Sequence, residues 1–118
     1  MKITERQTGD ITIVDVEGEM RFGDGEEGFC DALNKMLESG RAHFVINMAD
    51  VPYVDSAGLS QLVRSCGAAR KRGGELKLLN LTRRVRDLLA MTRLLSVIQA
   101  FESEEEAVGS FGDKQTTP

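Results

Sequence analysis

Residues 43–79 read HFVINMADVPYVDSAGLSQLVRSCGAARKRGGELKLL, and this stretch decides the fold class. The apolar run 43–48 predicts a central strand, and residues 49–55 form the connector that follows it. The next apolar side chains recur at helical spacing on one face: Leu59, Leu62, Val63, Cys66 and Ala69. The glycine pair at 73–74 ends this helix, and residues 75–79 predict another strand. Because strand, helix and strand in this order form a right-handed crossover between parallel strands, the stretch indicates an α/β fold.

The residues before this stretch predict two strands and a helix. Residues 2–8 and 10–17 are short strand patterns joined by a turn. Asp24 and Glu27 then form a capping-box-like helix start, and Gly40 supplies the helix end. The apolar face between them comprises Phe29, Ala32, Leu33, Met36 and Leu37.

The residues after it continue the alternation of helices and strands. Thr82 caps a short helix. The apolar face of that helix comprises Val85, Leu88 and Leu89. Residues 95–100 predict the last strand, and residues 103–106 form a second capping box. The helix that starts there is expected to run to Phe111, with residues 112–118 as a flexible tail.

The chain is therefore predicted to be one α/β domain, residues 1–111, with the order β-β-α-β-α-β-α-β-α. This order implies a mixed sheet of about five strands with about four helices packed on it. A length of 118 residues suits one domain, and 41% hydrophobic residues suffice for one core. Tryptophan is absent and aromatic residues make up 5%, so we expect an aliphatic core.

The cysteines and the histidine limit the chemistry. Cys30 and Cys66 both fall in predicted helices. One disulfide is possible, but unpaired thiols packed as small hydrophobic groups are favoured. Unpaired thiols are typical of a reducing compartment. His43 is the sole histidine and has no cysteine near it, so no metal site is predicted. There is no signal-peptide pattern and no run approaches the ~18 apolar residues of a membrane span, so we expect a soluble cytoplasmic protein.

Charge is unevenly distributed along the chain, whose net charge is −4. Residues 64–93 carry nine basic side chains against two acidic ones, a local charge of +7, so the remaining residues carry −11. The basic positions are Arg64, Arg70, Lys71, Arg72, Lys77, Arg83, Arg84, Arg86 and Arg93. This basic block is either a solvated face with cations at helix C-termini or a docking surface for an acidic partner or a nucleotide.

A glycine pattern at residues 23–28, GDGEEG, matches the spacing of a dinucleotide-binding loop. Its three carboxylates stand where a pyrophosphate needs bare N–H groups and a positive helix end. We therefore predict no nucleotide or other cofactor at this loop.

Ser56 is a candidate nucleophile, but the residues of a catalytic site are missing. The nucleophile motif G-x-S-x-G requires glycine where Val54 stands. His43 begins the strand whose far end leads to Ser56, a separation of about 15–20 Å at ~3.3 Å per residue. A general base must lie within hydrogen-bond reach of the serine. No catalytic residue is therefore predicted, and the protein is not expected to be an enzyme.

Ser56 also lies where the connector passes into a helix. Its hydroxyl is suited to cap that helix, which is a structural role. Gly58 is expected to keep the first turn free of side chains, so that the hydroxyl stays approachable. A phosphate on Ser56 would add a charge of about −1.5 to −2, which a helix N-terminus accommodates and a docked partner would not. The spacing alone leaves capping and switching both open.

The same residues resemble the signature of STAS domains. The segment 51–59, VPYVDSAGL, follows the strand FVINM at 44–48 as the family's signature does. Residues 18–20, Gly-Glu-Met, resemble the family's Gly-Glu-aliphatic segment after its second strand, and residues 73–78, GGELKL, resemble the start of its next strand. The order of elements fits the family from about residue 3 to 111.

Resemblance to the anti-sigma-factor antagonist branch implies a non-enzymatic phospho-switch protein. Ser56 matches the serine that an anti-sigma factor with serine kinase activity phosphorylates. The resemblance further implies that the unphosphorylated form binds the anti-sigma factor and frees the sigma factor, and that a serine phosphatase resets the switch. The implied partners are these proteins, without direct nucleic-acid contact; the oligomeric state stays open.

The resemblance also assigns residues around the serine. Asp55 matches the family's preceding acid, and Ala57 is an ordinary variant of its small residue. Asp55 and Gly58 are expected to shape the loop. The residues expected to contact a partner are Tyr53, Ser60 and Arg64.

Arg21 departs from the family pattern, because many antagonists carry an acidic residue there. Because this loop is expected to lie near the switch, Arg21 leaves the identity of the kinase open. Residues 22–25 also replace the usual polar helix start. The alternative function is a constitutive STAS subunit of a transporter or a large signalling assembly, in which Ser56 is only a helix cap.

Overall fold

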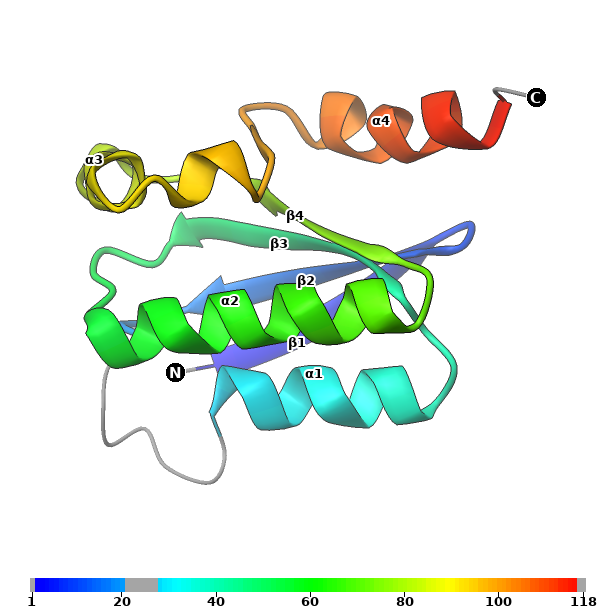
Figure 1. Ribbon diagram of the computed structural model, residues 1–118, viewed down its shortest axis with the longest axis horizontal. Coiled ribbons are helices and arrows are strands. Elements are labelled where there is room, and N and C mark those ends of the chain that lie inside the picture. Colours follow the sequence, from blue (N-terminus) through cyan, green and yellow to red (C-terminus); the bar gives the residue numbers. More distant parts are fainter. Residues whose placement is uncertain (1, 21–27, 117–118) are drawn as a thin grey trace.

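The computed structural model describes residues 2–20 and 28–116, with side chains up to Phe111. An initial pair of strands is followed by alternating helices and strands (Figure 1). The described elements are β1 (Lys2–Thr8), β2 (Ile11–Glu17), α1 (Phe29–Glu38), β3 (His43–Asp50), α2 (Ser56–Lys71), β4 (Glu75–Leu79), α3 (Arg83–Met91), the 3-10 turn η2 (Leu94–Ser96), β5 (Ala100–Phe101) and α4 (Glu104–Thr116). The predicted α/β class and order of elements are confirmed.

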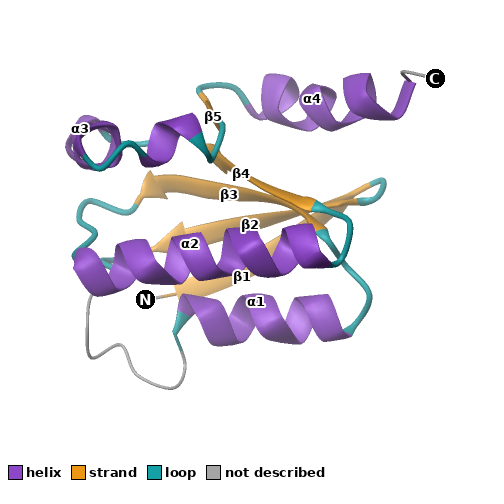
Figure 2. Ribbon diagram, viewed as in Figure 1, coloured by secondary structure: helices purple, strands orange, loops and turns teal. Residues whose placement is uncertain are grey.

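The described strands form one mixed sheet in the order β1-β2-β3-β4-β5. β1 pairs antiparallel with β2, and every later pair of neighbours is parallel. The register places Val45 of β3 between Ile13 of β2 and Lys77 of β4. Because β2 and β3 run in the same direction, their carboxyl ends lie together, beside the start of α2 (Figure 2).

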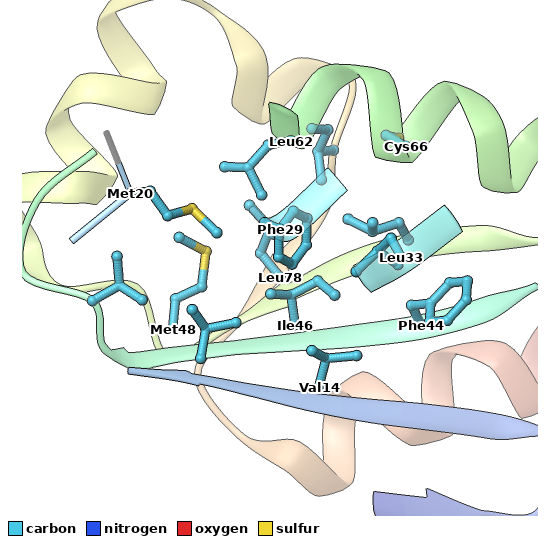
Figure 3. Packing of buried hydrophobic residues seen from close by; sticks show 14 of the residues in the cluster. Val14, Met20, Phe29, Leu33, Phe44, Ile46, Met48, Leu62, Cys66 and Leu78 are labelled. Carbon is cyan, nitrogen blue, oxygen red and sulfur yellow. The ribbon is translucent and has the colours of Figure 1, made fainter. Parts of the chain in front are cut away.

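Helices cover both faces of the sheet. The larger buried cluster joins one face to α1, α2 and α3, and α4 covers the other face. Figure 3 shows the larger cluster, in which Phe29 and Leu62 of the helices pack over Ile46 of β3. The smaller cluster comprises Ile11, Ile13, Val45, Leu79, Ala107 and Phe111. The core is mostly aliphatic, as the composition predicts.

The helix α2 follows the predicted pattern except at Val63, which was predicted on the apolar face and is 44% exposed. Leu62, Cys66 and Ala69 are buried at helical spacing on its inner face. Gly73, just after the helix, has φ +80°, a left-handed conformation that glycine adopts without strain. Cys66 and the half-buried Cys30 are both free thiols, as predicted, and burial raises the pKa of the Cys66 thiol.

An ionic cluster fastens the first turn of α4 to the β1–β2 hairpin. Arg6 donates to Asp15 (Nε to Oδ2, 2.7 Å) and to Glu104 (Nη2 to Oε1, 2.8 Å). Asn47 Nδ2 also donates to Asp15 Oδ1, at 2.8 Å. The hydrogen bond from Arg6 is the main reason that the pKa of Asp15 lies below its ordinary value; burial opposes it. This cluster therefore depends on an ionised Asp15.

Residues 95–100 do not form the predicted strand. Leu94–Ser96 form a 3-10 turn, and β5 is confined to Ala100–Phe101. The backbone N–H of Val97 and that of Ile98 both donate to the carbonyl of Leu94. The apolar run thus turns back on itself and buries Ile98, which is 1% exposed, in the larger cluster. A short apolar run has no periodicity that separates these two outcomes.

The helix ends were predicted with mixed success. Thr82 Oγ1 accepts from Val85 N and Ser103 Oγ accepts from Glu106 N, each at 3.3 Å, so both predicted caps are confirmed. The capping box at residues 24–27 lies outside the described residues, and α1 begins at Phe29 with Gly28 as its N-cap. The last helix continues beyond Phe111 to Thr116. The division into a domain of residues 1–111 and a flexible tail stays a prediction.

Candidate functional site

The connector that leads into α2 is fastened to the residues after β2. Met20 N donates to Tyr53 O, and Asp55 N donates to Met20 O, both at 2.9 Å. Met20 and Val54 thereby form an isolated parallel bridge. Both side chains are 1% exposed and pack in the larger cluster, where Figure 3 shows Met20 beside Met48. The start of α2 is therefore held in place by the core.

Asp55, rather than Ser56, caps α2. The Asp55 carboxylate accepts a hydrogen bond from Gly58 N (Oδ1, 2.9 Å), and its backbone is extended at φ −93° and ψ −176°. Ser56 is the first residue of the helix. The prediction that the Ser56 hydroxyl caps the helix is therefore wrong, because the carboxylate one residue earlier occupies the capping position.

Ser56 is exposed at the start of α2. Its hydroxyl makes no hydrogen bond with any residue in the described ranges 2–20 and 28–111. The positive end of the helix dipole stabilises a nearby anion by ~0.3–1 kcal/mol. The position can therefore carry an added phosphate without loss of the helix cap.

Gly58 is buried on the inner side of the first turn. A Cβ placed on it would lie 2.6 Å from the Met20 carbonyl oxygen and 2.8 Å from Val54 Cγ1. The close approach of the Met20 backbone and the Val54 side chain therefore requires glycine here. This is a different reason from the predicted one, which was access to the Ser56 hydroxyl.

Two hollows border Ser56. The first, of about 570 Å³, lies between the start of α2 and α3, and the second, of about 620 Å³, lies along α2. Tyr53, Asp55 and Ser56 line the first hollow. Ser56, Ser60 and Arg64 line the second. The structure thus brings these predicted site residues onto one surface around Ser56, with Ala57 half-buried in the first turn.

The sequence prediction did not assign α3 to this surface. Arg84, Leu88 and Met91 line the first hollow, and Met91 is 81% exposed. The Arg84 guanidinium stacks on the Tyr53 ring, with its central carbon 5.1 Å from the ring centroid. The spacing i, i+4, i+7 of these three α3 residues on one helix face was the available signal.

Part of the basic block has a structural role. Arg70 donates to the Val97 carbonyl (2.6 Å), and Arg72 donates to the Leu37 carbonyl (2.7 Å). Lys77 is 1% exposed, and its Nζ donates to Ser110 Oγ at 2.6 Å. These contacts stabilise the fold, so a docking role is left to cations such as the exposed Arg83 and Arg84.

His43 is placed far from Ser56 in the fold. It is the first residue of β3, whereas the connector to Ser56 leaves the last residue of that strand. The His43 ring packs edge-on against Phe111, with centroids 5.4 Å apart. In the part of the chain that the structure describes, no group of three His, Cys, Asp or Glu side chains could hold a metal ion. Within the same residues, no helix has the length and apolar character needed to cross a membrane.

The family model of the STAS domain matches residues 2–107. The chain belongs to the STAS domain family. A 78-residue stretch is 36% identical to the anti-sigma-B factor antagonist of Bacillus subtilis, over 66% of this chain and 71% of that protein. BtrV of Bordetella bronchiseptica is 25% identical over 111 residues, which are 94% of this chain and 95% of that protein. An anti-sigma factor antagonist from Mycobacterium paratuberculosis has the same fold, with a TM-score of 0.81, 16% identity and 92% of each chain covered.

Proposed function

We propose that this STAS protein is an anti-sigma factor antagonist controlled by phosphorylation of Ser56. The unmodified protein binds an anti-sigma factor that is also a serine kinase, in the cytoplasm. Phosphorylation releases that partner, and a serine phosphatase restores binding. The name of the Bacillus subtilis relative supports the class of partner. The exposed Ser56 hydroxyl at the first residue of α2 carries the proposal for the switch.

The separation of the cap from Ser56 makes the switch possible. Because Asp55 holds the Gly58 N–H, a phosphate on Ser56 removes no hydrogen bond of the fold among the described residues. The helix N-terminus also favours the new charge. At a docked interface, however, the same phosphate adds a dianion beside the Asp55 carboxylate, which disrupts binding by repulsion and desolvation. Modification thus changes binding and leaves the domain folded.

The proposed binding surface is the area around Ser56 that the two hollows define. Tyr53 and Asp55 border it on the α3 side, and Ser60 and Arg64 border it along α2. Ala57 and Gly58 set the shape of the first turn without reaching outward, since they are half-buried and buried. A partner that covers both hollows would enclose the Ser56 hydroxyl.

Mass spectrometry of the protein after reaction with the cognate kinase and ATP tests the proposal. We expect phosphate on Ser56 in the wild type and none in Ser56→Ala. Ser60→Ala is the matched control, because Ser60 is exposed one turn further along α2 and borders the same surface. Modification that persists in Ser56→Ala would contradict the proposal.

We also propose that the protein is not an enzyme. Ser56 has no histidine near it, since the sole histidine of the chain is at the other end of β3. Purified protein is expected to show no esterase or nucleotide hydrolysis. Turnover that disappears in Ser56→Ala would contradict a purely binding function.

A further inference from the structure

The residues that share a hollow with Ser56 indicate which side chain would bind a phosphate on it. This inference rests on the proposed function. We propose that Arg84 of α3 binds the phosphate carried by Ser56. Phosphorylation would then join the start of α2 to α3 across the hollow that separates them. No part of the proposed switch described above requires this contact.

Arg84 and Ser56 line the same hollow of about 570 Å³. The guanidinium carbon of Arg84 stands 5.1 Å from the ring centroid of Tyr53, three residues before Ser56. A cation at this distance from an aromatic ring is held by the electrons of the ring face. The Arg84 charge is therefore kept over the segment that leads into the modified residue.

The donors of Arg84 remain available for an anion. In residues 2–20 and 28–111 no ion pair or side-chain hydrogen bond to Arg84 is formed. Guanidinium presents five N–H donors in a planar fork that matches two phosphate oxygens. The Asp55 carboxylate already accepts from Gly58 N within α2. A phosphate on Ser56 would thus meet a cation whose hydrogen-bonding capacity is unused.

Both acidic and basic groups lie near Ser56, and they have opposite effects on a phosphate there. Asp55 and Asp87 line the hollow with Ser56, and Glu19 lines an adjoining hollow with Arg84. These three carboxylates disfavour a phosphate dianion, whereas Arg84 and the α2 N-terminus favour it. Arg64 borders Ser56 on the other side, but it lies two turns along α2, about 12 Å in helix rise, and its Nε points to the Ser60 carbonyl. The cation that faces the phosphate is therefore Arg84.

Phosphoserine encoded genetically at position 56 tests this contact without a kinase. Phosphorus-31 NMR measures the titration of the phosphate in the otherwise wild-type chain and in Arg84→Gln. Loss of Arg84 is expected to raise the proton affinity of the phosphate about 1.5- to 5-fold, the range that one exposed ion pair supports. Arg83→Gln and Arg64→Gln remove the same charge nearby and are expected to give less than half this shift. Arg84→Lys keeps the charge without the fork and should give an intermediate value.

An identical titration with and without Arg84 would overturn the proposal, and so would an equal shift in Arg83→Gln. Because the phosphate is installed during synthesis, this result is independent of whether a kinase modifies Ser56. A kinase that ignores Ser56 would contradict the proposed function, and the NMR titration would still decide the contact with Arg84.

Discussion

Replacement of Gly58 by alanine should destabilise the domain, although alanine is the better helix former. The added Cβ would lie 2.6 Å from the Met20 carbonyl oxygen and 2.8 Å from Val54 Cγ1, so Met20 and the connector must move apart. Overpacking of this kind costs ~1–3 kcal/mol. The same movement strains the Asp55–Met20 backbone hydrogen bond, whose net value is about 1 kcal/mol. Alanine regains at most ~1 kcal/mol of helix propensity. We expect a net loss of roughly 1–3 kcal/mol in the free energy of unfolding, measured by urea denaturation.

Gly67 in the same helix provides the matched control. A Cβ added there meets nothing within 4 Å, and the residue is exposed. Gly67→Ala should therefore raise the free energy of unfolding by about 0.5–1 kcal/mol. The two substitutions are chemically identical and should shift the urea midpoint in opposite directions. A Gly58→Ala midpoint at or above that of the wild type would refute the close-packing role of Gly58.

Four further substitutions test other parts of the structure. Asp55→Ala should lower the free energy of unfolding by ~0.5–2 kcal/mol through loss of the cap. Ser56→Ala should change the free energy of unfolding by less than ~0.5 kcal/mol. Equal losses in the two variants would indicate that Ser56 contributes to the cap. Asp15→Asn should be less stable than the wild type near neutral pH. Because the fold lowers the pKa of Asp15, the wild-type advantage should disappear in urea titrations as the pH falls below the ordinary value of 3.8. Ser65→Ala should raise the melting temperature, since the buried Ser65 hydroxyl has no partner among the described residues and alanine is the better helix former; a lower melting temperature would reveal a hydrogen bond.

Much of the fold is predictable from the periodicity of apolar residues. The segment 95–100 is the exception, because its apolar residues have no clear period. The stretch 43–79 is predictable because a buried strand, an amphipathic helix and a glycine end each have a distinct local pattern. The segment 95–100, LSVIQA, has no such pattern, because four apolar residues among six suit a strand or a buried turn equally. The turn forms because it packs Ile98 into the buried core.

The site was predictable in its position and less so in its details. The order of elements indicates that Ser56 begins a helix after a central strand, and the structure agrees. Asp55 and Ser56 are both polar residues that can cap a helix, so the sequence does not show which of them does. The extended backbone of Asp55 makes it the cap, and this conformation is seen only in the structure. The contact of Arg84 with Tyr53 joins residues 31 positions apart, so local spacing carries no trace of it. The sequence indicated that Gly58 shapes the loop, but its packing against Met20 is known only from the folded structure.

The affinity of the cognate anti-sigma factor for the protein with and without phosphate on Ser56 tests the switch most directly. Calorimetry on wild-type protein and on protein with phosphoserine encoded at position 56 gives both dissociation constants. We predict that the phosphate weakens binding at least about tenfold, which corresponds to ~1.4 kcal/mol, while both forms unfold at nearly the same temperature. Equal affinity of the two forms would contradict the switch and favour a constitutive STAS subunit.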